Sequence, residues 1–589
     1  MTTNSWAFEA FNAKKMSPVE LALSFVAPPS FSTLVGADHC YILGPRGSGK
    51  TTLLRMLQGE SLMARSDARA ARLRDLIPYS AVFVPADELW ASQASPEASR
   101  VAFCAQMLYA LVETMIYRTQ RIDAYENPVH LPADMSSAEE VVLARECAEA
   151  WGVSPSATGL YRLLSALDLK MLAIQTVTPG PRDPMVQADA MSLFAFGVRA
   201  FNRAARQPGH RWALLLDEME IAPKEVHDQV VSFVRGGSTT VIVKASMSPF
   251  DRYGSSFGVQ GSPIPGHDFQ PIYLADMKAG DVRRFTAGLW DGVLESHGLP
   301  AVSMEHALGR SAIEIPGGSS QTTDTEVRRV LRRAQSSDPG FARWLKERNI
   351  SPNRLQEMTY NERSATIRKV YPLLVFRDSV TTVRNGRVVR RSRKKDLEPF
   401  TGARAVTLAL EGNPRWAKTA FTQMLAGFDD RSNTIERGAQ FDALSSLAER
   451  FEGLLRVLPR RHAHPSTLPV ATIVDLVAAY FNAQNTGPFV SDPKNCFIVD
   501  QDAGTELIDA MILGLYAGAF VHIRDRRSEA LISDFRGNRF RLAYLLGVRD
   551  RREFPLRRGK DVRLGVVLDE ARGRGRLSDP PSEQLGLEF

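Results

Sequence analysis

The residues best suited to ligand binding and catalysis lie in a short glycine-rich segment near the N-terminus. Residues 44–51 read Gly-Pro-Arg-Gly-Ser-Gly-Lys-Thr and fit the pattern GxxxxGK[ST]. Glycines let the backbone curl so that successive amide groups point inward at phosphate oxygens. A helix that follows such a loop presents the positive end of its dipole to the same anion. The segment therefore predicts a site for a nucleoside triphosphate.

Two side chains at the end of this segment have separate expected roles. Lys50 is placed to reach the β- and γ-phosphates, and Thr51 to offer its hydroxyl to Mg²⁺. An apolar strand over residues 40–43 and a helix over residues 51–57 supply the context that the motif requires. The other residues expected to surround the phosphates are Gly44, Pro45, Arg46, Gly47, Ser48, Gly49 and Thr52.

A pair of acids further along the chain supplies a second contact for the metal. Residues 211–216 (RWALLL) indicate a buried central strand, which Asp217 and Glu218 follow directly. Asp217 would hold Mg²⁺ directly or through water. Glu218 would orient and deprotonate the attacking water, so that Glu218 and Lys50 are the predicted catalytic residues. The alternative interpretation is a buried strand that ends in a solvated turn.

Three more segments have the composition of strands, at residues 80–86, 239–246 and 269–274. A helix is expected over residues 224–234, and strands that alternate with helices predict an α/β fold with a doubly wound parallel sheet. Ligands of such sheets bind at the carboxyl ends of the strands. Ser246 ends one of these strands, where its hydroxyl could contact the γ-phosphate or the attacking water, although a serine is also an ordinary strand-end residue.

These segments resemble an AAA+ or STAND-type ATPase, and are most similar to bacterial proteins of the replication-initiator (origin-recognition) clade. The resemblance is carried by GPRGSGKTTLL, LLLDEME, the strand VIVKAS, and IYLADMKAGDVRRF, which would open a helical lid. A fifth feature is LEGNPRW at residues 410–416. In the family a GxPR-type turn starts a lid helix whose arginine reaches the nucleotide, and Arg415 matches that arginine. Asn413 and Pro414 suit a helix start, and an exposed surface arginine is the alternative.

The resemblance implies ATP and Mg²⁺ as ligands, ATP hydrolysis, and a homo-oligomer. It also implies an AAA+ core with a helical lid and a mainly helical, winged-helix-like C-terminal domain. A segment between the lysine turn and the acids is longer than a compact core needs, and its helical spacing leaves open a partner surface, a DNA contact or plain packing. The expected divisions are an N-terminal linker helix at 1–35, the core at 36–276 with a helical insertion at 89–206, the lid at 277–427 with a basic hairpin at 380–395, the basic domain at 428–570 and a flexible tail at 571–589.

Positive charge is concentrated in two places. Residues 524–563 contain thirteen basic and six acidic residues, which accounts for the whole net charge of +7. Residues 384–395 hold seven basic residues and no acid, next to an Asn385-Gly386 turn that indicates a hairpin. Clustered positive charge favours a polyanion such as duplex DNA, bound through its phosphates, and a solvated surface is the alternative. The predicted contacts are Arg390, Arg391, Arg393, Arg539, Arg541, Arg557 and Arg558.

The C-terminal region shows helical patterns at residues 441–458, 471–484 and 505–516, followed by strand patterns at 519–523 and 539–544. This order suits a winged helix, and a helical assembly module fits equally well. The four cysteines form no CxxC pair, and the longest apolar run, 510–521, is too short to cross a bilayer. A cytoplasmic protein without a membrane partner is therefore expected.

Two functions of different classes follow. The first is an ATP-driven switch that binds DNA and acts through oligomer or partner assembly. The second is a STAND-type signalling or scaffold ATPase that senses a protein or ligand and controls a separate effector, for example in phage defence. A motor or helicase is less favoured, because no further helicase-type motif accompanies the phosphate loop and the acids.

Overall fold

The computed structural model divides the chain into two compact units. Unit 1 comprises Met1–Leu274 with Glu529–Ser533, and unit 2 comprises Ala275–Ser528 with Asp534–Phe589. The boundary expected between core and lid, at residue 276, lies close to Leu274, where unit 1 ends. The expected lid and the expected C-terminal domain both fall within unit 2. The structure describes residues 16–64, 76–90, 93, 95–120, 133–153, 158–236, 238–250, 262–275, 277–315, 321–353, 360–384, 387–391, 398–458, 468–524, 531–549 and 552–573.

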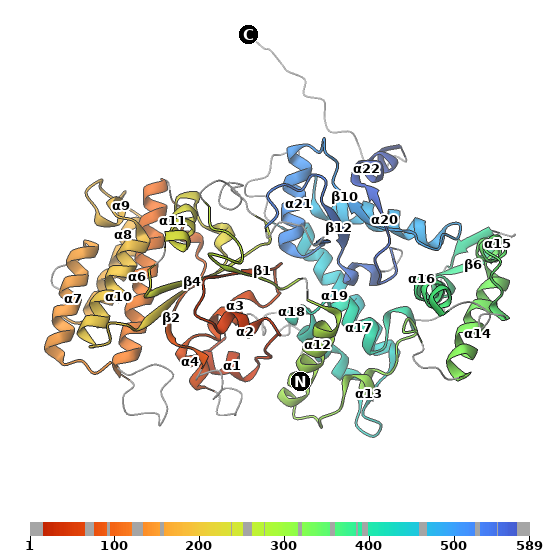
Figure 1. Ribbon diagram of the computed structural model, residues 1–589, viewed down its shortest axis with the longest axis horizontal. Helices are drawn as coiled ribbons and strands as arrows, with labels where there is room; N and C mark the ends of the chain where they lie inside the picture. Colours follow the sequence, from red (N-terminus) through yellow and green to blue (C-terminus); the bar gives the residue numbers. More distant parts are fainter. Residues whose placement is uncertain are drawn as a thin grey trace, which may run out of the picture. The chain divides into compact units, whose positions relative to one another are not determined.

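Unit 1 is built around a five-stranded sheet in the order β2-β3-β4-β1-β5, in which every neighbouring pair is parallel (Figure 1). This confirms the expected α/β fold with a parallel sheet. Parallel pairing brings the carboxyl ends of all strands to one edge. The strands are β1 (Cys40–Leu43), β2 (Tyr79–Val84), β3 (Arg211–Leu216), β4 (Val241–Met247) and β5 (Gln270–Tyr273).

The sheet is covered on both faces because its strands are apolar on both faces. Trp212, Leu214 and Leu216 of β3 join one apolar cluster, and Ala213 and Leu215, which alternate with them, join another. Continuous burial of this kind is what a parallel sheet between two helix layers requires. The second cluster takes its helical residues from α1 (Pro18–Leu23), α2 (Phe31–Val35), α3 (Lys50–Arg55) and α4 (Gly59–Met63).

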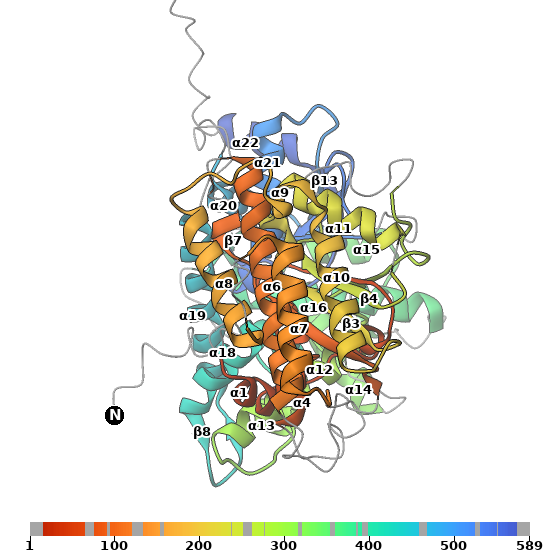
Figure 2. The same ribbon diagram turned by 90° about the vertical axis from the view of Figure 1, so that its left-hand side faces the viewer.

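The first cluster draws on the helices between β2 and β3, where a helical insertion was expected. Figure 2 shows α6, α7, α8 and α10 running side by side, and α6 also packs on β2. Apolar residues of α6 such as Leu108 and Leu111 are fully buried, so the insertion has a packing role in unit 1. The elements on this side are η1 (Glu88–Trp90), α6 (Pro96–Gln120), α7 (Ser137–Trp151), α8 (Leu160–Ile174), α9 (Pro184–Gln187), α10 (Ala190–Ala204) and α11 (Lys224–Gly236).

Unit 1 also contains a short segment from much later in the sequence. Residues 531–533, here called the re-entrant segment, lie between two strands of unit 2 in sequence but belong to unit 1. The Ile532 amide donates to the Pro249 carbonyl oxygen at 3.2 Å, and Ile532 forms a parallel bridge with Phe250. Leu531 is buried in the first apolar cluster. The re-entrant segment therefore pairs with the residues that follow β4 and adds one side chain to the apolar cluster.

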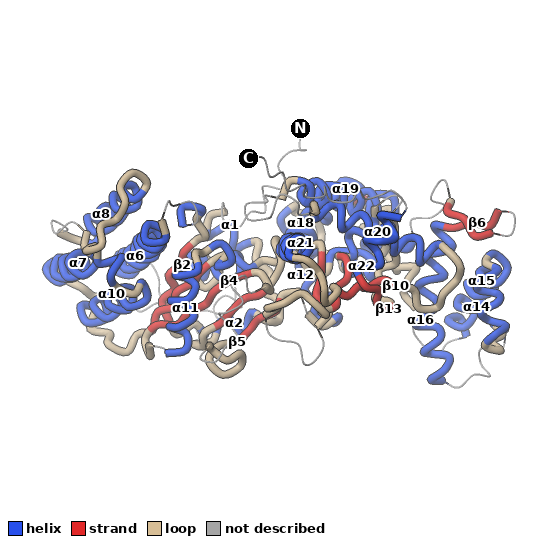
Figure 3. Tube along the Cα trace, turned by 90° about the horizontal axis from the view of Figure 1, so that it is seen from above, coloured by secondary structure: helices blue, strands red, loops and turns tan. Residues whose placement is uncertain are grey.

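Unit 2 is mainly helical. A basic hairpin of β6 (Thr381–Arg384) and β7 (Arg387–Arg390) follows α16 directly, as expected from the sequence (Figure 3). Across the described ranges, no helix has the length and apolarity that crossing a bilayer would require. The helices are α12 (Ala279–Ser296), α13 (Met304–Leu308), α14 (Gln321–Ser337), α15 (Pro339–Glu347), α16 (Tyr360–Val380), α17 (Ala403–Leu410), α18 (Pro414–Met424), α19 (Arg437–Arg456), α20 (Val470–Thr486), α21 (Thr505–Ala517) and α22 (Leu564–Gly573).

A four-stranded sheet in the order β11-β12-β10-β13 forms the C-terminal part of unit 2. The expected strands correspond to β11 (Phe520–His522) and β12 (Arg539–Leu542), which pair antiparallel. Two further strands, β10 (Lys494–Ile498) and β13 (Lys560–Arg563), were not predicted from the sequence, and they pair parallel with each other. The chain thus runs from α20 through β10 and α21 into the antiparallel pair β11 and β12, and the winged helix stays a prediction.

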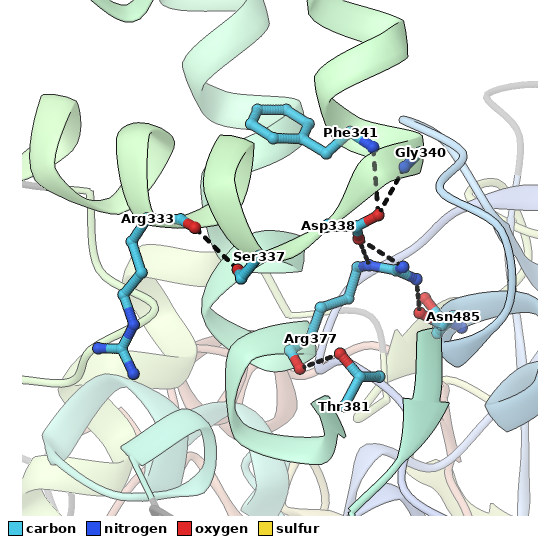
Figure 4. Close-up of polar contacts among 8 residues, drawn as sticks. All are labelled: Arg333, Ser337, Asp338, Gly340, Phe341, Arg377, Thr381 and Asn485. Carbon is cyan, nitrogen blue, oxygen red and sulfur yellow. Dashed lines mark hydrogen bonds and ion pairs between the residues drawn. The ribbon is translucent and has the colours of Figure 1, made fainter. Parts of the chain in front are cut away.

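A buried ion pair joins three helices of unit 2 (Figure 4). Asp338 caps α15 by accepting from the amides of Gly340 and Phe341, and its second oxygen accepts from Arg377 of α16 at 2.8 and 2.6 Å. Arg377 also donates to the carbonyl oxygen of Asn485 in α20. Because both charged groups are excluded from solvent and hydrogen-bonded, the pair fixes how these helices meet.

Candidate active site

The glycine-rich loop connects β1 to α3 at the carboxyl edge of the sheet, as expected. Gly47 and Gly49 have φ values of 82° and 93°, a left-handed conformation that glycine adopts without strain. The Gly44 amide donates to the carbonyl oxygen of Met247 at 3.2 Å, which fastens the start of the loop to β4. The loop is therefore a fixed turn at the N-terminus of α3, the geometry that a bound phosphate requires.

Lys50 lies under this loop with its side chain largely buried. Its Nζ donates to the carbonyl oxygens of Gly44 at 2.7 Å and Pro45 at 3.3 Å. Two neutral carbonyl groups of the loop thus hold the ammonium. Because these partners of the Lys50 ammonium in the loop are neutral, a polyphosphate would bring a negative charge to it. The residues therefore fit a nucleoside triphosphate.

Asp217 is the centre of the site and is completely buried. Its Oδ2 accepts from the Thr51 hydroxyl at 2.8 Å, and its Oδ1 accepts from the Ser246 hydroxyl at 2.7 Å. Strand register explains the second contact, because Leu216 pairs with Ala245 and the next residues therefore lie side by side. The structure thus brings together three residues that the sequence separates widely.

Glu218 follows in a strained backbone conformation, with φ 49° and ψ 51°. A non-glycine residue in this region is uncommon and is held there by its surroundings. Its amide donates to the Ser246 hydroxyl at 2.9 Å, so that one serine fixes both acids. The Glu218 side chain is half-buried, which leaves it accessible to a water molecule.

Glu220 is a site residue to which sequence reasoning assigned no role. It lies in η2 (Met219–Ile221), and both of its carboxyl oxygens are inaccessible to solvent and lack a hydrogen-bond partner among the described residues. Burial raises the pKa of this carboxyl to about 7, the Lys50 ammonium opposes the rise, and the charges of Glu218 and Asp217 add to it. The signal was present in the sequence as a third acid in LLLDEME.

The residues at this edge also fit Mg²⁺. A hydroxyl and a carboxylate in contact, Thr51 and Asp217, are hard oxygen ligands of the kind that Mg²⁺ takes. Within the described residues, no group of three or more His, Cys, Asp or Glu side chains is arranged to hold a metal by itself.

Arg415 belongs to unit 2, in the first turn of α18. Asn413 caps this helix, because its Oδ1 accepts from the amides of Arg415 at 3.1 Å and Trp416 at 3.2 Å. Pro414 occupies the first helical position, as expected. The local helix start is therefore confirmed, while contact between Arg415 and a nucleotide stays a prediction.

The predicted nucleic-acid contacts are mostly engaged inside the protein. Arg541 is buried, forms an ion pair with Glu411 and stacks over Tyr544, so its charge is engaged within the protein and its contact with a phosphate stays a prediction. Arg390 pairs at 3.0 Å with Glu553, a fully buried carboxylate. A charge count along the sequence cannot distinguish such pairs from free surface charge.

The remaining members of this set differ in exposure. Arg539 pairs with Asp561 at 3.0 Å, and Arg557 donates to the carbonyl oxygen of Lys369. Arg391 is half-buried and Arg558 is exposed. Arg393 lies outside the described residues. Of the predicted contacts within the described ranges, Arg558 is therefore the one best placed to meet a phosphate.

The fold and the site together define a P-loop ATPase core of the AAA+ class. The lysine loop follows β1, the acids follow β3, and β4 with its serine lies between them in an all-parallel sheet. The model of the ORC-CDC6-like family matches residues 7–564, so the chain belongs to the ORC-CDC6-like family. This confirms the resemblance to the origin-recognition clade. No curated protein and no solved structure matches the chain.

Proposed function

We propose that this protein is an ATP-driven switch that binds ATP with Mg²⁺ and hydrolyses it to control the assembly of an oligomer or of a complex with a partner. The observation that carries the proposal is the hold on Asp217, whose two carboxyl oxygens accept from Thr51 and Ser246. A carboxylate fixed from both sides cannot rotate away from a metal bound at Thr51. Such fixed orientation is what catalysis by electrostatic stabilisation requires.

Each residue of the site has a distinct task in this proposal. Lys50 and the loop amides hold the phosphates, and Thr51 and Asp217 hold the metal, which neutralises charge that develops on the β- and γ-phosphates. Glu218 accepts the proton of the attacking water. Arg415, on the capped helix α18, is proposed to contact the nucleotide when the lid closes.

Two substitutions test the chemistry. We expect Lys50→Ala to lose nucleotide binding, because the buried cation that pairs with the phosphates is gone. We expect Glu218→Gln to keep binding and to lose hydrolysis by on the order of 100-fold, the usual contribution of a general base. Fluorescent-nucleotide titration and phosphate release measure the two effects separately. Hydrolysis by Glu218→Gln at the normal rate would refute the assignment of the base.

Duplex DNA is the proposed partner of the switch. Membership in the ORC-CDC6-like family and the positive charge of residues 524–563 support it. Engagement of Arg390, Arg539 and Arg541 by carboxylates leaves fewer free cations than the sequence suggests. We therefore place the contact on exposed basic residues around β13, namely Arg558, Lys560 and Arg563.

A further inference from the structure

Glu220 carries a carboxylate that the proposed chemistry does not use. Both of its oxygens are inaccessible to solvent and have no hydrogen-bond partner within the described part of the chain. A buried, unpartnered carboxylate is strongly unfavourable, because it loses its hydration without a compensating bond. Burial therefore favours the neutral form of Glu220, and a ligand that donates hydrogen bonds to its carboxyl oxygens would favour the charged form.

The charges around Glu220 indicate the nature of that group. The positive charge of Lys50 lowers the pKa of the Glu220 carboxyl, whereas the negative charges of Glu218 and Asp217 raise this pKa. A triphosphate without its metal would add more negative charge to this region. A hydrated cation would instead bring water molecules that donate hydrogen bonds to a carboxylate.

Direct coordination by the acids together does not fit the structure. Glu220, Glu218 and Asp217 form no metal-holding group within the described residues. Mg²⁺ dehydrates reluctantly and keeps several waters in nucleotide sites. An acid that does not touch the ion can still accept hydrogen bonds from the water molecules on it. Acids in such positions strongly affect the affinity for the metal.

We propose that Glu220 makes nucleotide binding depend on Mg²⁺: its carboxylate accepts hydrogen bonds from water on the metal and repels a triphosphate that arrives without one. The proposal rests on the proposed function, since it requires ATP at the Lys50 loop. Glu218 and Glu220 are both half-buried as residues, but it is the carboxyl oxygens of Glu220 that are inaccessible to solvent and without a hydrogen-bond partner within the described part of the chain. Solvent screens the charge of Glu218 more strongly.

The test compares binding with and without the metal. A fluorescent, non-hydrolysable ATP analogue is titrated into the full chain at pH 8, in excess Mg²⁺ and then in EDTA. This pH lies above the value of about 7 to which burial raises the pKa of the Glu220 carboxyl. The measured quantity is the dissociation constant in EDTA divided by the dissociation constant in Mg²⁺. We expect Glu220→Gln to lower this ratio by on the order of tenfold, through weaker binding with Mg²⁺ and tighter binding without it.

Matched variants separate this role from a structural one. Glu220→Asp keeps the charge and should keep most of the Mg²⁺ dependence, whereas Glu225→Gln, which neutralises an exposed acid of α11 outside the site, should leave the ratio near that of the unmodified protein. Mn²⁺ bound with the nucleotide, followed by electron paramagnetic resonance, should be held more weakly in Glu220→Gln. If the glutamine variant does not fold, Glu220→Ala is measured against the same criterion.

The outcomes distinguish the two proposals. An unchanged ratio in Glu220→Gln, with normal Mn²⁺ retention, would overturn the role of Glu220 while leaving the ATPase proposal intact. Failure of the unmodified protein to bind the analogue, or binding by Lys50→Ala at full strength, would overturn the proposed function first and the role of Glu220 with it.

Discussion

Ser246 shows how one small side chain can govern the acids of this site. Its hydroxyl donates to Asp217 and accepts from the amide of Glu218, so it fixes a carboxylate and a strained backbone at once. A hydroxyl has one donor and two acceptor sites, which is sufficient for both bonds. Through these two contacts Ser246 positions both acids, and its predicted contact with the γ-phosphate or the attacking water stays a prediction.

We expect Ser246→Ala to slow ATP hydrolysis by about tenfold or more, because residues that orient a metal-binding carboxylate typically have effects of that size. Nucleotide binding should change little, since the Lys50 loop is untouched. Ser246→Thr, which keeps the hydroxyl, is the matched control and should retain most of the rate. Equal hydrolysis by the alanine variant and the unmodified protein would show that Asp217 needs no second support.

Among the site residues, those in contiguous sequence motifs could be predicted from the sequence. The loop around Lys50 and the pair Asp217–Glu218 were predictable because each is a contiguous motif with one physical purpose. Ser246 was predictable only as a candidate, because its contact with Asp217 depends on the register of β3 against β4. The role of Glu220 was not predictable, since burial of its oxygens is a property of the folded site.

The elements of unit 2 meet at the ion pair between Asp338 and Arg377. Asp338 uses one oxygen as a helix cap for α15 and the other to receive Arg377 of α16, and Arg377 continues to α20. Such a pair is costly to break because the remaining partner is left charged and buried. A second pair nearby, Arg333 with Asp378, lies at the surface.

We expect Arg377→Met to destabilise unit 2 by about 3 kcal/mol or more, because Asp338 would keep a buried charge without its cation. Arg333→Met is the matched control, and its loss should cost at most about 1 kcal/mol, since its side chain is 52% exposed. Urea unfolding followed by tryptophan fluorescence measures both, with Trp344 of α15 close to the site. Similar unfolding midpoints for the two variants would contradict the argument.

Element prediction succeeded where a segment is a continuous apolar run or has a regular apolar spacing, and failed where charged residues hide the pattern. Strands β1 and β3 and helices α19 and α21 lie near their expected ranges because their apolar spacing is regular. Strand β13 was missed because Lys560 and Arg563 give it the composition of a surface loop. Its pairing with β10 is parallel and distant in the sequence, so no turn signal marks it.

At the scale of the whole molecule, net charge overstates the positive surface. The segment 524–563 carries the entire excess of +7, but its Arg541 and Arg539 are paired with carboxylates. The charge that remains for a polyanion is the exposed part, which includes Arg558 and Lys560. Affinity for duplex DNA should therefore be modest and should depend on salt.

We expect the double variant Arg558→Ala, Lys560→Ala to weaken duplex binding uniformly across sequences and to reduce the slope of log affinity against log salt by about one per lost contact. Arg283→Ala, which removes an exposed arginine outside this segment, is the control and should bind normally. Fluorescence anisotropy over a salt series measures the slope. Binding that is absent or independent of salt would favour a protein partner over DNA.

The re-entrant segment bears on how this protein can be dissected. The ATPase half is not a continuous stretch of chain, because Leu531 fills its apolar interior and Ile532 donates to Pro249 shortly after Ser246. A fragment cut at Leu274 would lack Leu531 from this apolar cluster and would lose the backbone bond to Pro249, which follows β4. Expression of unit 1 alone would therefore require these late residues to be joined to it. Exchange of one unit between proteins by a single cut in the chain would also leave this segment with the wrong unit.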